Sequence, residues 1–400
     1  MTPELRWLTP GDDAAHTALM NEAFARGRRP ATLDFTGALP AEKPRSPQLG
    51  FFEAGRLVAA ATYHAMHLGW GGGVELAMSG VAGVACAADC RGRGYVARLL
   101  AEGLRDMRER RQPLSGLFPF AYAFYRKHGW DWVGEQRSYT AALSMIPSFP
   151  EGRDTRRMEG MEALETVRPI YEAYTRRYRG MITRKDPNPN YWSGLDHRDG
   201  YTTYTYVYRN PVTSADEGYL VFRYPAEGDT ATLHEFFALT PSAYRGLLSM
   251  LHYYGTQLAK VSWNAPLDDP LALYIQGYDL QTRLIPLFMG RIASVDQALT
   301  ALQPATDLTG SVTIGVTDSQ AEWNTGAFAL EIEGGAVSVS RTDQAPGMSL
   351  DIATLSQAYW GQPSLDRLRA AGRLEVLDEP AYQLLAALLP PATCFLKDGF

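Results

Sequence analysis

The clearest chemical signal in the chain is a turn at residues 91–94, with the sequence Arg-Gly-Arg-Gly. It follows an apolar run over 75–87 that predicts a buried strand, and it precedes a helical pattern that begins at Tyr95. The first N–H groups of a helix have no partner within the helix, and the helix dipole adds partial positive charge there. Glycines let the backbone approach a phosphate closely, and arginines supply charge. The segment therefore predicts an anion site, and the alternative is a turn with solvated arginines.

Other common catalytic and nucleotide-binding motifs are missing from the sequence. No Gly-Lys-Ser/Thr follows the turn, its glycines lack the Gly-x-Gly-x-x-Gly spacing, and no Gly-x-Ser-x-Gly elbow occurs. The three cysteines, Cys86, Cys90 and Cys394, have no further Cys or His pair at a zinc-binding spacing, so no metal is expected. Cys86 stands in an apolar strand without a neighbouring His, which favours a buried, inert thiol over a nucleophile.

A mixed arrangement of strands and helices is needed to position the turn. The run over 75–87 is expected to be a strand with a bulge at Gly80 or Gly83, because isolated glycines in a strand mark such irregularities. The run after Gly94 has an apolar side and a charged side, which predicts an amphipathic helix. The turn thus joins the end of a strand to the beginning of a helix.

The composition is that of a folded, slightly acidic globular protein. Hydrophobic residues make up 46% and charged residues 20% of the 400 residues. Lys and Arg number 38 against 44 Asp and Glu, a net charge of −6, which argues against nucleic acid and favours cationic partners. Neither a signal peptide nor an apolar run long enough for a membrane span occurs. We therefore expect a cytoplasmic protein.

The length predicts two to three domains at roughly 150 residues each. A linker is expected at residues 145–152, where two prolines interrupt any helix or central strand. The middle of the chain repeats the order of helix, strands and helix, and its segment 237–248 resembles the strand-to-helix passage of 84–100 with fewer glycines. The expected domains span residues 1–145, 146–288 and 289–400.

The turn and a later aromatic segment resemble the GNAT N-acetyltransferases. The family's acyl-CoA-binding signature, Arg/Gln-x-x-Gly-x-Gly/Ala, is matched by Arg91 and Gly94, with Val96 where Gly or Ala is usual. The segment 124–130, Phe-Tyr-Arg-Lys-His-Gly-Trp, resembles the family's Phe-Tyr-x-x-x-Gly-Phe/Tyr. The resemblance implies acetyl-CoA as cosubstrate and an acetyl-CoA site formed by Val84, Ala85, Cys86, Arg91, Gly92, Arg93, Gly94, Tyr95 and Val96.

The layout of the whole chain is similar to that of the Eis (enhanced intracellular survival) acetyltransferases, with support from the runs 324–330 and 351–361 and from the aromatic terminus Phe400. This resemblance implies that the α-carboxylate of Phe400 is the general base. It also implies that Tyr125 protonates the CoA thiolate, a task that suits a phenol. The alternatives are a packing aromatic for Tyr125 and a frayed terminus for Phe400.

The expected fold class is α/β (α+β), with tandem GNAT-like domains, the second degenerate, and a C-terminal sterol-carrier-protein-like domain that supplies the terminal carboxylate. The expected reaction is direct attack of a primary amine on acetyl-CoA in a ternary complex. Family resemblance implies a cationic substrate (an aminoglycoside, a polyamine or a lysine side chain) and a hexamer. Glu22 and Asp398 are candidates for an acidic amine pocket, with ordinary surface carboxylates as the alternative.

Two other functions remain open at this stage. One is a GNAT activity on a protein N-terminus or another small amine, using the same residues. The other is a non-catalytic ligand-binding protein with a vestigial CoA site, in which the third domain holds an apolar ligand. Turnover in the presence of acetyl-CoA and polyamines distinguishes the enzyme from the binding protein.

Overall fold

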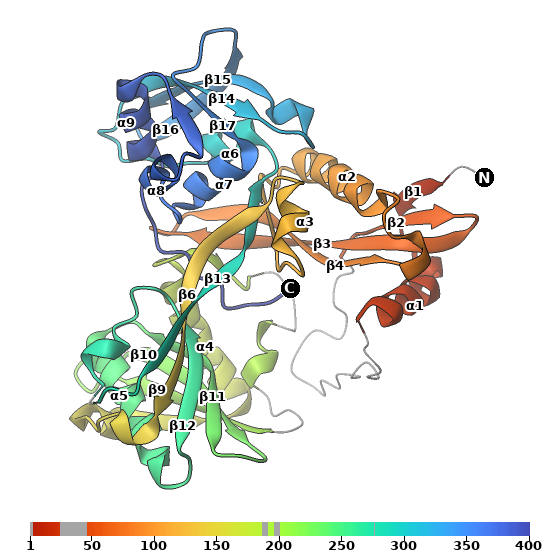
Figure 1. Ribbon diagram of the computed structural model, residues 1–400. Helices are drawn as coiled ribbons and strands as arrows, with labels where there is room; N and C mark the ends of the chain where they lie inside the picture. Colours follow the sequence, from red (N-terminus) through yellow and green to blue (C-terminus); the bar gives the residue numbers. More distant parts are fainter. Residues whose placement is uncertain (1–2, 25–45, 186–190, 196–200, 276) are drawn as a thin grey trace.

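The computed structural model describes residues 3–24, 46–185, 191–195, 201–275 and 277–400. In the described part of the chain, strands from the first two thirds form a single sheet, and a separate five-stranded sheet belongs to the last third. Figure 1 shows the last third at the top, the first third in the middle and the second third below it. The observed mixture of sheets and helices confirms the predicted α/β class.

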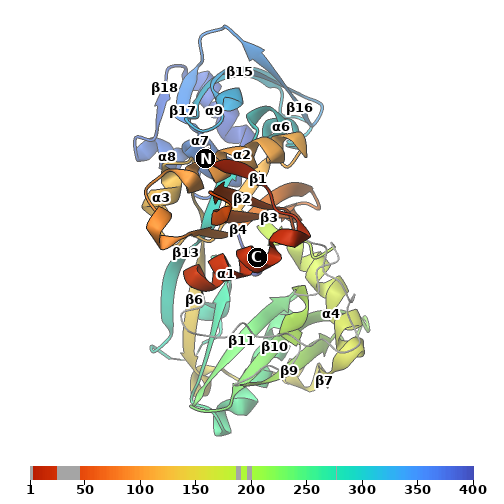
Figure 2. The ribbon, with the colours of Figure 1, turned by 90° about the vertical axis from the view of Figure 1, so that its right-hand side faces the viewer.

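The first part of the chain builds one half of the large sheet. Its elements are β1 (Glu4–Trp7), α1 (Asp13–Phe24), β2 (Gln48–Glu53), β3 (Arg56–Trp70), β4 (Glu75–Cys86), α2 (Tyr95–Glu109), β5 (Leu114–Leu117), α3 (Tyr122–Arg126) and β6 (Asp131–Ala142). Helices α1 and α2 cover opposite faces of β3 and β4 (Figures 1 and 2). The predicted amphipathic helix after Gly94 is confirmed, because α2 buries Leu99, Leu104 and Met107 against the sheet.

Strand β4 is bulged and then separates from its neighbour. The bulge is at Gly83, whose φ is +55°, and the pairing with β3 shifts by one residue there. Of the two predicted positions, Gly83 is therefore confirmed. Parallel pairing with β5 covers only Met78 to Gly80, although β4 continues to Cys86. Residues 81–86 thus present a backbone edge with no strand paired to it on that side in the described structure.

The second part of the chain completes the large sheet by exchanging strands with the first. Its elements are β7 (Thr155–Met158), α4 (Gly160–Thr175), β8 (Arg179–Ile182), β9 (Tyr201–Arg209), β10 (Asp216–Pro225), β11 (Thr230–Ala238), α5 (Pro241–Tyr253), β12 (Lys260–Ala265) and β13 (Gln281–Ile292). Strand β13 lies between β5 and β6, and β6 lies between β13 and β12. Each half therefore uses a long strand of the other. The boundary predicted between residues 288 and 289 lies inside β13.

The third part packs onto both shared strands. Its elements are α6 (Val295–Thr300), β14 (Gly310–Thr317), β15 (Gly326–Glu333), β16 (Ala336–Thr342), β17 (Met348–Asp351), α7 (Ile352–Trp360), α8 (Leu365–Ala370), β18 (Leu374–Val376) and α9 (Glu379–Leu388). Helix α7 is buried along its whole length because it contacts β6 and β13 on one side and the smaller sheet on the other. That position explains why most residues of this helix are apolar on every side.

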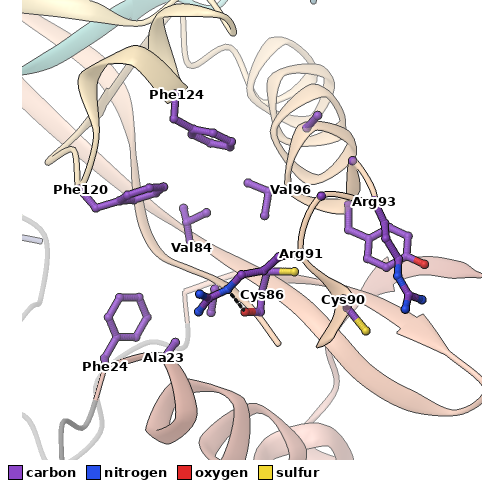
Figure 3. A pocket seen from close by; sticks show the side chains of 15 residues that line it. Ala23, Phe24, Val84, Cys86, Cys90, Arg91, Arg93, Val96, Phe120 and Phe124 are labelled. Carbon is purple, nitrogen blue, oxygen red and sulfur yellow. Dashed lines mark hydrogen bonds between the residues drawn. The ribbon is translucent and has the colours of Figure 1, made fainter. Parts of the chain in front are cut away.

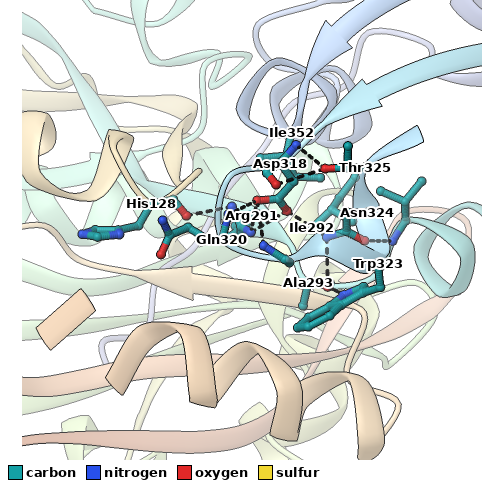
Figure 4. Close-up of polar contacts among 12 residues, drawn as sticks. His128, Arg291, Ile292, Ala293, Asp318, Gln320, Trp323, Asn324, Thr325 and Ile352 are labelled. Atoms are coloured by element: carbon teal, nitrogen blue, oxygen red, sulfur yellow. Dashed lines mark hydrogen bonds and ion pairs between the residues drawn. The ribbon is translucent and has the colours of Figure 1, made fainter. Parts of the chain in front are cut away.

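A buried arginine joins the first and third parts (Figure 4). Arg291 Nη1 donates to the carbonyl oxygen of His128 at 2.7 Å, and Nη2 donates to both Asp318 carboxylate oxygens at 2.9 and 2.6 Å. Burial lowers the pKa of Arg291 from its ordinary value, and the Asp318 charge opposes that shift. Gly129 lies against the guanidinium, and a Cβ there would be 1.6 Å from Nη1. The contact explains a glycine four residues after Tyr125.

The C-terminal segment returns to the centre of the molecule. After α9 the backbone pairs with β8, where Arg179 N donates to Thr393 O at 3.1 Å and Phe395 N donates to Arg179 O at 2.9 Å. Phe395 and Leu396 are buried in the core. The terminus then lies between the first and second parts, as both ribbon views show (Figures 1 and 2).

Candidate active site

A cavity of about 890 Å³ opens where β4 passes into α2 (Figure 3). Its remaining walls come from the end of α1 and from two phenylalanines that follow β5, Phe120 and Phe124. The structure brings all nine residues predicted for acetyl-CoA binding to this cavity: Val84, Ala85, Cys86, Arg91, Gly92, Arg93, Gly94, Tyr95 and Val96. These residues are close in sequence, and the succession of strand, turn and helix directs them toward the same cavity.

The turn at residues 91–94 has the geometry of an anion cradle. Gly92 and Gly94 have φ values of +78° and +79°, which other residues adopt at a cost, and a Cβ on either would meet no atom of the described residues within 4 Å. The helical hydrogen bonds begin with Arg98 N to Gly94 O at 3.2 Å. The N–H groups of residues 95–97 therefore have no partner within the helix. The turn offers space, amide donors and the positive end of α2 together.

The two arginines of the turn have different surroundings. Arg93 Nη1 donates to both Glu53 carboxylate oxygens at 3.0 and 2.8 Å, and its Nη2 donates to Asp89 O at 3.0 Å. The charge of Arg93 is thus already paired. Among the described residues Arg91 makes one long contact, 3.5 Å from Nε to Cys86 O, and its side chain lies along the cavity in Figure 3. Unlike Arg93, Arg91 thus has no carboxylate partner within the described part of the chain.

Tyr125 lies directly behind the aromatic wall of the cavity. Its ring makes edge contacts with Phe120 and Phe124, with ring centroids 5.3 and 5.1 Å apart. The side chain is buried, and burial raises the pKa of Tyr125 to about 12. Its phenol is therefore protonated at neutral pH. The hydroxyl makes no hydrogen bond to another residue of the described structure, so its proton is not committed elsewhere.

Phe400 lies where β4 and β5 separate. A Cβ on Gly80 would be 2.5 Å from Phe400 Cδ2, so the ring packs flat against a strand position that only glycine leaves open. The Phe118 ring, one residue after β5, is 5.2 Å from the Phe400 ring, centroid to centroid. Gly80 is also the last residue of β4 that pairs with β5. The chain end thus lies where β4 and β5 begin to separate. Farther along β4, residues 84–86 line the cavity.

Asp398, two residues before the terminus, is held by a buried arginine. Arg184 Nε and Nη2 donate to the two Asp398 carboxylate oxygens at 3.0 and 2.6 Å, and the Tyr171 hydroxyl is 2.9 Å from Oδ2. Nη2 also contacts Glu235. The exposed fractions of the three charged side chains are only 1%, 11% and 2% for Arg184, Asp398 and Glu235. Lys397, also largely buried, stands beside this cluster.

The charges of this cluster stabilise one another. Burial alone would raise the pKa of Glu235, but the positive charges of Arg184 and Lys397 reverse the effect and hold the pKa below its ordinary value. Glu235 also accepts a hydrogen bond from the Tyr219 hydroxyl at 2.6 Å. A pair of this kind is costly to break, because the remaining partner is left buried and charged. We name the contacts of Arg184 with Asp398 and Glu235 the tail clasp.

The structure separates the two carboxylates predicted for an amine pocket. Asp398 belongs to the tail clasp and does not line the cavity. Glu22 lies at the end of α1, and its Oε1 accepts a hydrogen bond from Ala88 N at 2.9 Å, next to the anion turn. Sequence reasoning missed Arg184 and Glu235, because Arg184 is 214 residues from Asp398 and 51 residues from Glu235. An arginine in a strand-to-loop segment is ordinarily solvated, so only the fold identifies it.

The second part of the chain contains a similar strand-to-helix passage without an anion cradle. Pro241 opens α5 and has no N–H, and Thr240 Oγ1 accepts the Ala243 N–H at 3.2 Å. Arg177 Nη1 donates to Ala238 O at 2.9 Å, and Nη2 bonds to Leu239 O. These contacts occupy the strand end that in the first part faces the cavity. The predicted degeneration of the second copy thus has a physical basis.

Neither metal ligands nor membrane-crossing helices are evident in the described residues. No group of three or more His, Cys, Asp or Glu side chains among them is arranged to hold a metal ion. No helix in the same residues has the length and apolar character to cross a membrane.

Family models match the chain in three segments. Residues 4–133 match an acetyltransferase (GNAT) domain, residues 180–292 match a second acetyltransferase (GNAT) domain, and residues 295–397 match a sterol carrier protein domain. Relatives named uncharacterized N-acetyltransferase occur in Streptomyces. One from Streptomyces griseus is 25% identical over 408 residues and covers 94% of both chains. One from Streptomyces avermitilis is 26% identical and covers 82% of this chain and 83% of its own.

Solved structures share the complete fold. A probable N-acyltransferase from Enterococcus faecalis has a TM-score of 0.88 at 21% identity, with both chains covered in full. Eis1 from Mycobacterium abscessus has a TM-score of 0.79 at 21% identity, again with full coverage of both chains. The succession of two acetyltransferase domains and a sterol carrier domain therefore extends over the whole chain.

Proposed function

Because this chain belongs to the Eis-like GNAT family of N-acetyltransferases, we propose that it transfers the acetyl group of acetyl-CoA to a primary amine of a cationic substrate. The proposed substrates are aminoglycosides, polyamines or lysine side chains. The proposal depends most on the observation that all nine residues predicted for acetyl-CoA line one cavity, at the end of the same strand, β4, against which Phe400 packs. The proposal includes a cytoplasmic hexamer, which light scattering of the purified protein tests.

Acetyl-CoA fits the residues of the cavity. Its pyrophosphate would lie on the turn of Gly92 and Gly94, where amide donors and open space coincide, with Arg91 as the counter-charge. The unpaired edge of β4 over residues 84–86 supplies backbone donors and acceptors for an extended, amide-bearing chain such as pantetheine. A volume of about 890 Å³ is at the upper end of small-molecule sites, as a ligand of this size requires.

The Phe400 carboxylate is suited to act as the general base. An amine in water is an ammonium ion and must lose a proton before its nitrogen attacks the thioester carbon. In our proposal the terminal carboxylate takes that proton, and its negative charge also attracts the cation. Its position where β4 and β5 separate supports the role, because that gap leads toward the strand edge at 84–86. Backbone N–H groups of that edge would stabilise the oxyanion that forms on the thioester oxygen.

Tyr125 is suited to act as the general acid. When the C–S bond breaks, the electron pair remains on sulfur, and the thiolate takes the Tyr125 proton. The raised pKa keeps that proton on the phenol until the thiolate forms. The Arg291 contact to His128 O fixes the segment that follows Tyr125, which supports a defined hydroxyl position. The nitrogen of the intermediate loses its second proton to solvent as the amide forms, solvent reprotonates the Tyr125 phenolate, and the amide and CoA leave.

We assign Asp398 to positioning of the chain end instead of to the amine pocket. Its charge is matched by Arg184, so a substrate amine would have to displace a buried guanidinium. The tail clasp acts two residues before Phe400 and thereby limits the positions of the terminal carboxylate. Asp398 would then influence turnover without touching the substrate.

Release of CoA thiol in the presence of a polyamine panel tests the proposed function. Arg91→Gln is expected to raise the KM for acetyl-CoA, whereas Arg105→Gln, an exposed arginine of α2 outside the cavity, is the matched control. Activity only on peptide N-termini would favour the other GNAT activity. Acetyl-CoA binding with no turnover on any amine would refute the enzyme proposal and favour the binding protein.

A further inference from the structure

The second GNAT copy retains a cavity at the place that corresponds to the acetyl-CoA cavity of the first. A space of about 330 Å³ lies where β11 passes into α5, just as the larger one lies where β4 passes into α2. The preceding helix and the loop after the next strand complete both cavities. The two GNAT copies therefore have a cavity at the same place in the fold, but different residue types line it.

The lining of the smaller cavity is aromatic with one carboxylate. The six residues that matter are Tyr174, Tyr178, Phe236, Tyr244, Tyr274 and Asp269. The Tyr174 and Tyr178 ring centroids are 5.3 Å apart. Tyr244 stacks on Tyr274 at 5.4 Å and meets Phe236 edge-on at 4.9 Å. Two groups of packed aromatic rings therefore contribute to the lining of the cavity.

In this cavity the groups that could bind a phosphate either are missing or already have hydrogen-bond partners. Pro241 lacks an N–H, and Thr240 takes the Ala243 N–H. Arg177 also contributes to the wall, but both of its terminal nitrogens bond to the carbonyl oxygens of Ala238 and Leu239. An anion would therefore find no free turn of amides like that at Gly92 and Gly94.

The Asp269 carboxylate has hydrogen bonds but no paired cation in the described structure. Its Oδ1 accepts from the Tyr244 hydroxyl at 3.0 Å and from Leu271 N at 3.1 Å. The nearby Arg137 Nη1 contacts the backbone oxygen of Asp269, at 3.5 Å, and the Tyr139 hydroxyl, at 3.2 Å. Burial raises the pKa of Asp269 to about 6, as expected of a carboxylate without a close counter-charge.

We propose that this cavity binds a small organic ammonium ion. The Asp269 carboxylate would neutralise its charge, and the aromatic rings would contact its methyl or methylene groups through cation–π attraction. The volume is at the lower end of small-molecule sites and suits a compact ion. The site is separate from the proposed catalytic residues, so it does not depend on the proposed reaction.

Choline is the appropriate probe, because it has no primary amine and cannot be acetylated on nitrogen. Titration calorimetry of the full chain, with acetyl-CoA present to fill the first cavity, should detect choline binding. The neutral isostere 3,3-dimethyl-1-butanol should bind about tenfold more weakly or not at all, since it lacks the charge. Failure of catalysis would leave this measurement intact, so the two proposals are tested independently.

Two variants identify the site. Asp269→Asn keeps the shape of the side chain and one oxygen acceptor but removes the charge, so it should weaken choline binding about tenfold or more. Asp229→Asn, which changes an exposed carboxylate outside the cavity, should not weaken it. Tyr274→Leu should also weaken binding, and Tyr274→Phe should restore it, because the ring is kept. Thermal unfolding shows whether each variant is folded. If Asp269→Asn does not fold, the comparison of Tyr274→Leu with Tyr274→Phe still tests the site. Acetyl transfer should be unchanged in all of them.

The pH dependence of choline binding provides a further readout. The groups that face Asp269 are Arg137 and Tyr139 of β6, Tyr174 of α4 and Tyr244 of α5. The pKa values of the three phenols and of Arg137 are raised, so none of them changes charge between pH 5 and 8. Choline affinity should therefore fall as pH decreases through about 6, where Asp269 takes up a proton.

Three results would overturn the proposal. These are no choline binding at millimolar concentration, equal binding of the neutral isostere, and unchanged affinity in Asp269→Asn. Preference for the isostere would instead identify an apolar ligand site.

Discussion

Replacement of Asp398 by Asn tests whether the tail clasp positions the chain end. The variant keeps the size of the side chain and removes the charge that Arg184 holds through bonds of 3.0 and 2.6 Å. Arg184 retains Glu235, so no charge is left without a partner. The perturbation is therefore confined to the last residues of the chain.

The expected cost follows from these contacts. An amide offers one oxygen acceptor in place of two, so one of the two Arg184 bonds is lost, and the other no longer joins two charges. A hydrogen bond to a charged group contributes about 1.5–3 kcal/mol, so we expect the docked tail to lose about 2–3 kcal/mol. At about 1.4 kcal/mol per factor of ten, the undocked population rises ~30- to 150-fold.

Release of Phe400 by a carboxypeptidase that accepts aromatic termini measures this population. When docking is fast relative to cleavage, the rate of release follows the undocked fraction and should rise by the same factor. Turnover should fall, because a fraction of molecules lacks the terminal carboxylate at any time, while the KM for acetyl-CoA stays unchanged. Asp343→Asn, an exposed carboxylate after β16, is the control and should alter neither rate.

The opposite pattern would refute the reasoning. Unchanged release of Phe400, combined with a raised KM for the amine at constant kcat, would mean that Asp398 binds substrate and that its ion pair with Arg184 does not hold the tail. That outcome would restore the amine-pocket role predicted from the sequence.

Three further predictions concern the first GNAT domain. Gly94→Ala places a side chain at φ +79° on the anion turn and should raise the KM for acetyl-CoA about tenfold, whereas Gly55→Ala, at φ +80° in a hairpin turn, should leave that KM unchanged. Tyr125→Phe should lower kcat by about a hundredfold with an unchanged KM for acetyl-CoA in steady-state kinetics, and retained turnover would remove the acid role. Gly129→Ala places a Cβ 1.6 Å from Arg291 Nη1 at a residue whose φ is +83°. It should lower the free energy of unfolding, measured by urea titration, by about 2–5 kcal/mol. A loss no larger than that caused by Gly55→Ala would contradict the packing explanation.

Local features of the site were predictable from the sequence because short-range patterns determine them. The bulge at Gly83, the glycine turn and the helix that begins at Tyr95 are consecutive in the chain, and each depends on residue types within a few positions. The nine residues that the GNAT resemblance implied for acetyl-CoA line one cavity because a strand, a turn and a helix follow one another directly there. The degenerate second passage was also visible, because Pro241 and Thr240 stand where glycines would be needed.

Long-range arrangements were not predictable in the same way. The exchange of β6 and β13 pairs strands whose sequences carry no information about their neighbours. The pairing of Arg184 with Asp398 joins residues 214 positions apart, and each alone has the character of a surface residue. The smaller cavity collects its aromatic residues from four separate segments. These features depend on how the elements are assembled, which a single sequence does not specify residue by residue.

The central claim is that the last residue of the chain provides the catalytic base. One glycine appended after Phe400 moves the α-carboxylate by a residue and leaves the Phe400 ring and the tail clasp in place. We predict that kcat for a polyamine falls by about a hundredfold or more, with unchanged thermal unfolding and an unchanged KM for acetyl-CoA. Turnover equal to that of the unmodified chain would contradict the claim and assign deprotonation of the amine to another group.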